Sequence, residues 1–348
     1  MAGSTPNRRV SLIATVRNEE RSLPTLLASL AQQTRLPDEV VVVDGGSTDG
    51  TVALLRSWGR LQPFPVQVLE EPGANIARGR NLAIAACAHE RIAVTDAGVE
   101  LDRRWLEKLT ERFDRPTPAQ FVAGVFRGRA ETIFQAAMSA TTLPLPEELV
   151  EGRFLPSSRS VAFTKSAWRR VGGYPEWAAY CEDLLFDLAQ VAGGNSPALA
   201  RDAVVHFAPR GSLPAYWRQY RNYAMGDGQT GLLLRRHLIR YATYLVLMPA
   251  LLWLAANRSR WWLVGFPLGA AVYLGPSWRR LPALTPAWPL RQRLRAALWV
   301  PLLRVWGDLA KMLGYPRGWR HGWRHRALNR LYKQGFLGTT HSDPTTEE

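Results

Sequence analysis

The chain has 348 residues, of which 47% are hydrophobic, so it can form a sizeable core or two domains. Its two cysteines, Cys87 and Cys181, exclude a disulfide framework and are expected to be buried thiols in a reducing compartment. The net charge of +15 is uneven: residues 206–338 carry 21 Lys and Arg against two acids, whereas residues 1–205 carry 23 against 24. Long apolar runs separate the arginines of the basic part, which favours an anionic membrane surface over nucleic acid as its partner.

Apolar strand patterns alternate with helical patterns along the first part of the chain, and no signal peptide is expected before them. Continuous valine runs such as residues 40–43 indicate strands buried on both faces, as in a parallel sheet covered by helices. The alternation predicts a doubly wound α/β domain over residues 1–230. The expected strands are 10–16, 39–44, 65–71, 91–98 and 121–128, and the expected helices are 17–33, 51–59, 75–88 and 103–113.

The predicted strands of this domain end in polar motifs. In doubly wound sheets the ligand lies beyond the carboxyl ends of the strands. The motifs at these ends are TVRNEE (15–20), DGGSTDG (44–50) and DAG (96–98). We therefore expect a ligand site that all of them border.

Residues 231–280 contain two apolar runs, 238–256 and 261–275, which predict two transmembrane helices. Both runs are slightly shorter than the 20 or so residues that a span needs, so a buried helical hairpin is the alternative. Aromatic residues at the run ends are typical of membrane interfaces. The arginines in the connecting segments predict that the α/β domain lies on the cytoplasmic side of the cell membrane.

Residues 281–335 predict a basic helical region. Within it Arg304, Asp308 and Lys311 recur at helical spacing, which predicts a helix that lies in the membrane interface with these charges on one face. The basic tail of this region suits an anionic headgroup layer. Residues 336–348 predict a disordered tail.

The loop after the second strand, DGGSTDG, fits none of three familiar ligand loops. A Walker loop requires a lysine where Thr51 stands, the glycine spacing differs from a dinucleotide fingerprint, and an EF-hand requires a glutamate where Leu55 stands. Asp44 either shapes a tight turn or accepts hydrogen bonds from a nucleobase or ribose, and Asp49 is expected to cap the next helix.

Several motifs in order resemble those of family 2 glycosyltransferases, which have the GT-A fold, over about residues 8–230. They are TVRNEERSLPTLLASLAQQT with DEVVVVDGGSTDGT, then ARGRNLAIAACAHERIAVTDAGVELDRRWLEKL, then GGYPEWAAYCEDLLFDLAQ. The resemblance implies a nucleotide-sugar donor of UDP or GDP type and a divalent cation such as Mg²⁺ or Mn²⁺.

The resemblance also implies roles for single residues. Asp183 matches the catalytic base, which Glu182 supports, and Asp96 matches the first acid of the metal-binding Asp-x-Asp motif. A carboxylate base deprotonates the acceptor hydroxyl, and a divalent cation neutralises the diphosphate leaving group. The donor nucleotide or diphosphate would be contacted by Thr15, Arg17, Glu19, Asp44 and Arg80.

The sequence departs from the family pattern at two places. Gly98 stands where the second metal acid is usual, and His206 is either a metal ligand or a core histidine. The motif of processive synthases is absent from YWRQYRNYAMGDG, which favours a single sugar addition. Arg218 and Arg221 of this segment either reach the diphosphate, with GDG as a tight loop near the site, or form a solvated basic helix. Ser158 and Arg159 are further candidates for contact with donor phosphate or acceptor.

We therefore expect a membrane-attached inverting glycosyltransferase with a lipid-linked or cell-envelope glycan acceptor, membrane lipids as partners, and no nucleic acid. The alternatives are a degenerate protein that binds sugar nucleotides and transfers weakly, and a basic membrane adaptor without chemistry.

Overall fold

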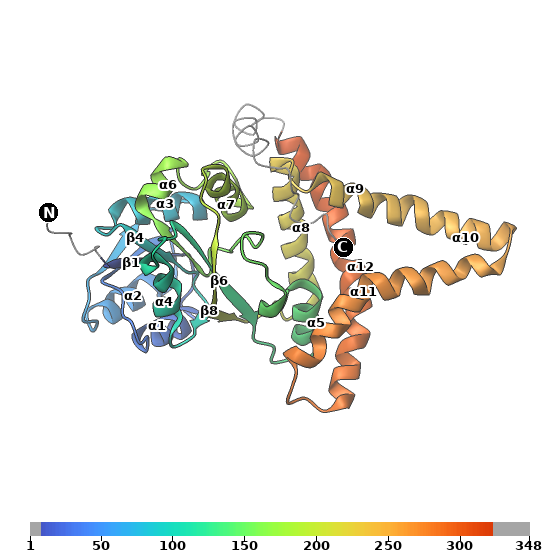
Figure 1. The fold of residues 1–348 in the computed structure, drawn as a ribbon, viewed down its shortest axis with the longest axis horizontal. Helices are drawn as coiled ribbons and strands as arrows, with labels where there is room; N and C mark the ends of the chain where they lie inside the picture. Colours follow the sequence, from blue (N-terminus) through green and yellow to red (C-terminus); the bar gives the residue numbers. More distant parts are fainter. Residues whose placement is uncertain (1–7, 323–348) are drawn as a thin grey trace. The chain divides into compact units, whose positions relative to one another are not determined.

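The computed structural model describes residues 8–322, which divide into two compact units. The sheet unit comprises residues 8–127 and 146–207, and the helical unit comprises residues 128–145 and 208–322. In chain order the elements of the sheet unit are β1 (Val10–Val16), α1 (Leu23–Ala31), β2 (Glu39–Asp44), α2 (Thr51–Gly59), β3 (Val66–Glu70), α3 (Ile76–Ala86), β4 (Arg91–Val94), β5 (Val99–Leu101), α4 (Trp105–Thr110), η1 (Glu111–Asp114), β6 (Phe121–Gly128), η2 (Pro146–Glu148), β7 (Val161–Thr164), α6 (Lys165–Arg170), α7 (Glu182–Ala192) and β8 (Ala198–Phe207) (Figure 1).

The eight strands of this unit form one mixed sheet in the order β3-β2-β1-β4-β7-β6-β8-β5. Strands β3, β2, β1 and β4 are parallel, which confirms the predicted α/β sheet, whereas β7 pairs antiparallel with both β4 and β6, and β5 pairs antiparallel with β8. In the parallel half Val16 lies opposite Asp44, and Asp44 lies opposite Glu70. The carboxyl ends of β1, β2 and β3 are therefore level, which brings the polar motifs after β1 and β2 to the same edge of the sheet.

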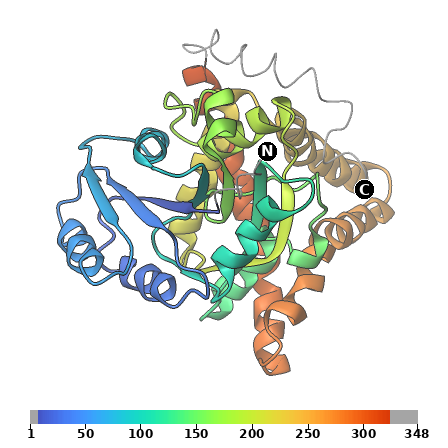
Figure 2. The ribbon, with the colours of Figure 1, turned by 60° about the vertical axis from the view of Figure 1, so that its left-hand side comes forward.

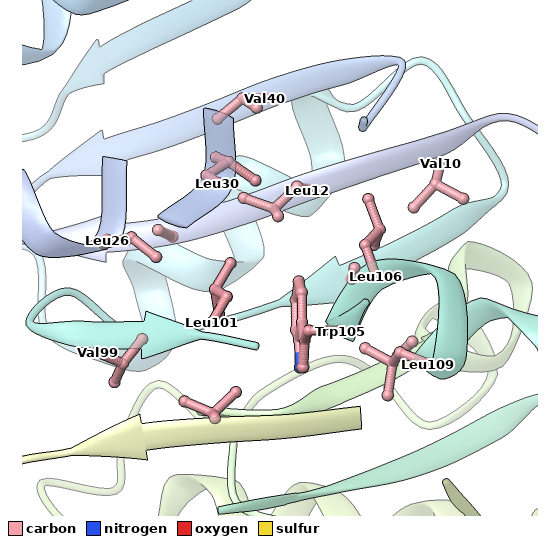
Figure 3. Close-up of a cluster of buried hydrophobic side chains, with 14 of the residues drawn as sticks. Val10, Leu12, Leu26, Leu30, Val40, Val99, Leu101, Trp105, Leu106 and Leu109 are labelled. Atoms are coloured by element: carbon pink, nitrogen blue, oxygen red, sulfur yellow. The ribbon is translucent and has the colours of Figure 1, made fainter. Parts of the chain in front are cut away.

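Buried side chains cover both faces of the parallel strands. Val40 and Val42 belong to one apolar cluster and Val41 and Val43 to another on the opposite face, because successive side chains of a strand alternate. The first cluster includes Trp105 of α4, whose indole N–H donates to the Ser160 hydroxyl at 2.8 Å. Figure 3 shows this cluster between β1, β2, β5 and the helices α1 and α4. The valine run thus has the double burial that the sequence predicts.

The predicted helix over residues 17–33 begins later than expected, at Leu23. Asn18 has a φ of 56°, a left-handed conformation that interrupts a right-handed helix. Pro24 lies in the first turn of α1, where its missing N–H costs nothing. Residues 17–22 therefore form a loop at the end of β1, which leaves their side chains available to a site.

The helical unit contains a pair of long helices and a helical hairpin. Helices α8 and α12 lie side by side, and the hairpin of α10 and α11 projects away from α8 (Figures 1 and 2). In chain order its helices are α5 (Ile133–Thr142), α8 (Leu213–Thr230), α9 (Leu234–Ala242), η3 (Thr243–Leu247), α10 (Met248–Asn257), η4 (Arg260–Val264), α11 (Gly265–Leu284) and α12 (Leu290–Gly322).

Within residues 8–322, one helix is long and apolar enough to cross a membrane, the continuous stretch Leu234–Asn257. None of its most apolar window is buried in the protein. The second predicted run, residues 261–275, is divided between η4 and the start of α11. The predicted tail, residues 336–348, lies outside the described residues.

The structure corrects the expected polarity of α12. Arg304, Asp308 and Lys311 share one face of this helix, as predicted, but the face is turned inward, since Asp308 is only 3% exposed and the other two are half-buried. Asp308 accepts a hydrogen bond from Arg240 Nε at 2.7 Å, and the Lys311 ammonium lies 4.9 Å from the centroid of the Tyr220 ring. The charges face inward because their partners lie on neighbouring helices, which the spacing along one helix cannot reveal.

Candidate functional site

The site is organised around Arg80, which α3 presents to the interior of the sheet unit. Its side chain is 2% exposed. Nη1 donates to Glu182 Oε1 at 2.8 Å, and Nη2 donates to Asp96 Oδ1 at 2.9 Å. The guanidinium carbon also lies 5.2 Å from the centroid of the Tyr174 ring. One cation thus joins the DAG motif after β4 to the Glu-Asp motif that begins α7.

Burial and charge act in opposite directions on this cluster. Burial lowers the pKa of Arg80, but the carboxylates of Asp96 and Glu182 outweigh it and raise that pKa above its usual value, so the guanidinium stays charged. Burial raises the pKa of Glu182, and Asp183 raises it further against the opposing effect of Arg80. The positive charge of the guanidinium therefore allows Asp96 and Glu182 to lie close to each other.

Asp183, the predicted base, lies in the first turn of α7, directly after Glu182. Its side chain is half-exposed, and Oδ1 accepts from the backbone N–H of Leu184 at 2.8 Å. Cys181 precedes the helix with a φ of 62°, so the chain turns sharply into α7. The helix N-terminus favours negative charge there. The carboxylate is thus held at a helix end where an acceptor can reach it.

A third acid, Asp187, lies one helical turn after Asp183 and was not singled out from the sequence. It is 2% exposed, and its Oδ2 has no hydrogen-bond partner among residues 8–322. Burial, followed by the nearby Asp183, raises its pKa well above the usual range. An i, i+4 spacing puts both acids on one helix face, a signal that the sequence does contain.

Tyr174 and Ser158 line the same region. The Tyr174 ring is 1% exposed and stacks on Phe186 with ring centroids 4.1 Å apart. Its hydroxyl lies 3.1 Å from the Ser158 hydroxyl, in a buried hydrogen bond. Ser158 was a candidate for donor or acceptor contact, and its hydroxyl here has Tyr174 as a partner. Tyr174 was missed because an isolated tyrosine after Gly-Gly has no distinctive spacing.

A second arginine flanks Asp96, the acid that is predicted to bind metal or diphosphate. Arg159 Nε lies 3.7 Å from Asp96 Oδ2, and the Arg159 guanidinium lies 4.7 Å from the centroid of the Phe207 ring. Gly98 has a φ of +73°, and a Cβ there would lie 3.1 Å from Ser22 Cβ. An aspartate at this position would be strained, which accounts for the departure from the Asp-x-Asp pattern.

The described residues do not form a metal centre by themselves. No group of three His, Cys, Asp or Glu side chains within residues 8–322 is placed to hold a metal ion. Asp96 has its oxygens near Arg80 and Arg159, and His206 lies opposite Glu100 across the β5–β8 pair. The residues present thus do not fit a preformed divalent-cation site, and the role of Asp96 and His206 as metal ligands stays a prediction.

The loop after β1 carries the predicted nucleotide contacts Thr15, Arg17 and Glu19. Thr15 is half-buried, and its methyl group lies close to Gly79 of α3. A Cβ added at Gly79 would lie 2.9 Å from that methyl group. Glu19 donates its backbone N–H to Thr51 Oγ1 at 2.8 Å, and its carboxylate accepts from the Ser22 hydroxyl. Arg17 is exposed. The predicted contacts of these residues with a nucleotide stay predictions.

Asp44 shapes the loop that follows β2. Its side chain is 2% exposed, and Oδ2 accepts from the backbone N–H groups of Gly46 at 2.9 Å and Ser47 at 2.8 Å. Gly46 has a φ of 93°, which the turn requires and glycine permits. Asp49 Oδ1 accepts from the N–H of Thr51 at 3.1 Å, at the start of α2. The turn interpretation of Asp44 therefore holds, and contact with a base or ribose stays a prediction.

Arg218 and Arg221 belong to the helical unit, on α8. Arg218 is exposed and Arg221 is half-buried. The expected tight loop at GDG was wrong, since Gly226 to Gly228 lie inside α8. A Cβ at Gly228 would lie 2.1 Å from the Tyr315 carbonyl oxygen, so this glycine permits close packing on α12.

Sequence comparisons identify related proteins. Residues 11–174 match the family described as Glycosyl transferase family 2. The O-antigen chain rhamnosyltransferase RfbN of Salmonella typhimurium is 23% identical over 230 residues, which are 60% of this chain and 70% of that protein. The lipopolysaccharide core biosynthesis glycosyltransferase LpsC of Rhizobium meliloti is 34% identical over 94 residues, which are 27% of this chain and 33% of that protein.

Solved structures share the fold. The mannosyltransferase PcManGT from Pyrobaculum calidifontis, in complex with GDP-Man and Mn²⁺, has a TM-score of 0.59 at 23% identity and covers 84% of this chain and 87% of its own. TarS from S. aureus, in complex with UDP-GlcNAc, has a TM-score of 0.50 at 19% identity and covers 94% of this chain and 92% of its own. Residues 11–174 thus match family 2 of the glycosyltransferases, and the likeness to the solved structures shows that the chain has the GT-A fold.

Proposed function

We propose that the protein transfers a single sugar, with inversion, from a UDP- or GDP-type donor to a lipid-linked or cell-envelope glycan. The reaction takes place at the cytoplasmic face of the cell membrane. Support for the acceptor class comes from RfbN and LpsC, which are named for O-antigen and lipopolysaccharide core synthesis. Support for the donor class comes from PcManGT and TarS, whose structures contain GDP-Man and UDP-GlcNAc.

The observation that carries the proposal is the double ion pair of Arg80. Its bonds of 2.9 Å to Asp96 and 2.8 Å to Glu182 fix the acid expected on the donor side relative to the start of α7. Asp183 follows Glu182 directly, so the same cation fixes the base. A transferase needs this arrangement, because the base and the leaving group must be on opposite sides of one anomeric carbon.

In the proposed reaction Asp183 accepts the proton of the acceptor hydroxyl. The hydroxyl oxygen forms a bond to the anomeric carbon as the bond from that carbon to the diphosphate oxygen breaks, which inverts the configuration. The leaving diphosphate takes the electron pair of the broken bond. Arg159, beside Asp96, is the nearby cation that can balance part of this charge.

The remaining assignments extend the same site. Thr15, Arg17, Glu19 and Asp44 would contact the nucleotide. The helix α8 arginines would bind diphosphate as cations. A divalent cation would need ligands beyond Asp96 and His206, and donor phosphate oxygens are of the class that Mg²⁺ and Mn²⁺ prefer.

A panel of UDP- and GDP-sugars tests the proposal, with nucleoside diphosphate release measured on the full chain in detergent. We expect one donor to be turned over, faster when a membrane glycolipid extract is added. No release from any donor, in a protein that still binds UDP or GDP by calorimetry, would instead favour a degenerate donor-binding protein. Gly98 favours this second candidate, because it replaces a usual metal acid.

Metal dependence is measured in the same assay. Mn²⁺ or Mg²⁺ is added to protein treated with EDTA, and donor binding is followed alongside release. If divalent cations support the reaction, release rises at least several-fold on addition. Release that is unchanged by EDTA would assign the neutralisation of the diphosphate to arginine side chains.

A further inference from the structure

Exposed apolar side chains are concentrated in the helical unit. Among residues 8–322, the large hydrophobic side chains that are exposed in the sheet unit are Leu36, Leu61, Ile76 and Val150, each far from the others in sequence. All the others belong to the helical unit, between Tyr223 and Trp319. Scattered single residues are normal on a soluble surface, whereas a continuous apolar surface indicates a partner.

Helix α12 carries a continuous part of this surface, which we call the leucine stripe. Its members recur every three or four residues and therefore share one face of the helix. Leu298 is 78% exposed and Leu302 is 44% exposed. The leucine stripe consists of Leu290, Leu294, Leu298, Leu302, Val305, Leu309 and Leu313.

The opposite face of α12 is buried, and small residues and one acid lie on it beside apolar side chains such as Leu303. Gly307 and Gly314 are buried, and a Cβ at Gly314 would lie 2.2 Å from the Arg221 carbonyl oxygen of α8. Asp308 is buried beside them, where the hydroxyls of Tyr244 and Tyr273 donate to Oδ2 at 3.0 and 2.5 Å. In the middle of the helix Arg304, Asp308 and Lys311 therefore face inward and the leucine stripe faces outward, the reverse of a helix that faces water.

We propose that the leucine stripe of α12 lies in the plane of an anionic lipid bilayer and contacts its acyl chains, in addition to any insertion of the hairpin. The proposal rests on the proposed function only because both place the protein at a membrane. The hairpin of α10 and α11 projects from the unit on the side away from α8 (Figure 1).

The charges around the leucine stripe favour lipid over a second copy of the chain. Arg291 and Arg295 at the start of α12 and Arg317 and Arg320 near its end are exposed. Exposed acids are missing from α12, whose single acid in residues 290–322 is the buried Asp308. Two copies packed through this face would bring arginines together, whereas lipid phosphates would neutralise them.

Depth-dependent fluorescence quenching tests this placement in the full chain. The accessible thiol is removed by Cys181→Ser, and an environment-sensitive fluorophore is attached in turn through Leu298→Cys, Leu252→Cys of α10, and Leu61→Cys of the sheet unit. Leu61 is the matched control, because its 82% exposure resembles the 78% of Leu298. The protein is bound to vesicles of phosphatidylcholine and phosphatidylglycerol that contain a quencher either near the headgroups or at the bilayer centre.

At position 298 we expect the shallow quencher to quench at least twofold more strongly than the deep one. At position 252 we expect the deep quencher to be the stronger. At position 61 we expect no quenching by either quencher. Equal protection of positions 298 and 61 from both quenchers would overturn the proposal. Cross-linking between copies at position 298, without quenching, would overturn it in favour of a dimer. Nucleoside diphosphate release in detergent is recorded for each protein, so that a failure of the transferase proposal is seen separately.

Discussion

Arg80 combines near-complete burial with two carboxylate partners, and it therefore determines how the site responds to substitution. Replacement by an uncharged side chain would leave Glu182 and Asp96 without their common cation. Glu182 is the more critical of the two, since its side chain is 11% exposed against 25% for Asp96. Removal of one partner of a buried ion pair costs more than the pair contributes, because the other charge stays desolvated.

We predict that Arg80→Met lowers the free energy of unfolding by about 3 kcal/mol, because it breaks a buried pair. Urea denaturation followed by circular dichroism measures the loss. The matched control is Arg78→Met on the same helix, whose ion pair with Glu71 at 2.7 Å is solvent-exposed. Similar losses in the two variants would contradict the central role of Arg80.

Asp183→Asn keeps the shape of the side chain and removes its basicity. We predict a fall of about 10²- to 10⁴-fold in the transfer rate, which is the usual contribution of a general base. Donor affinity, measured by calorimetry, should change little. Asp202→Asn on β8 is the control, as it removes an exposed acid at another position. Full activity of the Asp183 variant would exclude this residue as the base.

Asp187→Asn should make stability less sensitive to pH. In the folded chain burial raises the pKa of Asp187, and the negative charges of Asp183 and Glu182 raise it further. The positive charge of Arg80 lowers this pKa by less than the other effects raise it. In the unfolded chain Asp187 loses its proton near pH 4, whereas in the folded chain it keeps the proton. The folded state therefore becomes less stable relative to the unfolded state as pH rises above about 4. Thermal unfolding should show a variant more stable than the native chain at pH 7, with a difference that shrinks towards pH 4. A difference that is independent of pH would contradict a protonated Asp187.

At the scale of elements, the glycines of α8 and α12 have a role that their sequence context conceals. The spacing of GDG predicted a loop, because glycine is the commonest residue where a chain turns. In the structure glycines instead line the contact between α8 and α12, where backbones approach closely. A Cβ at Gly318 would lie 1.9 Å from the Met225 carbonyl oxygen. A glycine in a loop and a glycine at a helix contact look alike in the sequence. They differ only in which residues of another segment lie against them.

We predict that Gly318→Ala lowers the free energy of unfolding by about 1–3 kcal/mol, the usual cost of an extra methyl group in a packed contact. Gly269→Ala in α11 is the control, because nothing lies within 4 Å of its added Cβ. There the better helix propensity of alanine should raise stability by up to about 1 kcal/mol. Thermal unfolding in detergent distinguishes the two. Equal effects would argue against close contact of α8 and α12.

At the scale of the whole molecule, basic charge and exposed apolar surface occur in the same part of the chain. Residues 206–338 carry 21 Lys and Arg and two acids, and the helical unit has most of the exposed apolar side chains among residues 8–322. Charge alone would suit either nucleic acid or anionic lipid. We predict anionic lipid from the apolar surface, because acyl chains can cover it and nucleic acid phosphates cannot.

The protein should therefore stay in the membrane fraction after a wash at about 1 M salt, where the screening length falls to about 3 Å and purely ionic contacts are lost. Detergent should release it. Immunodetection in pellet and supernatant measures the distribution, with a ribosomal protein as the reference for ionic attachment. Release by salt alone would indicate a peripheral, electrostatic attachment and would contradict contact with acyl chains.

The sequence alone predicted strands β1, β2, β3, β4 and β6 and the helices between them, because strand burial and helix periodicity are local properties. It also located Asp96, Asp183 and Arg80 as candidates, since each stands in a family motif. It did not predict β5, β7, β8, α6 or α7. Only the tertiary structure decided that Arg80 joins the other two segments, that Asp187 is buried, and that Arg304, Asp308 and Lys311 of α12 face inward. Each of these depends on contacts between segments far apart in the chain, whose partners no local pattern records.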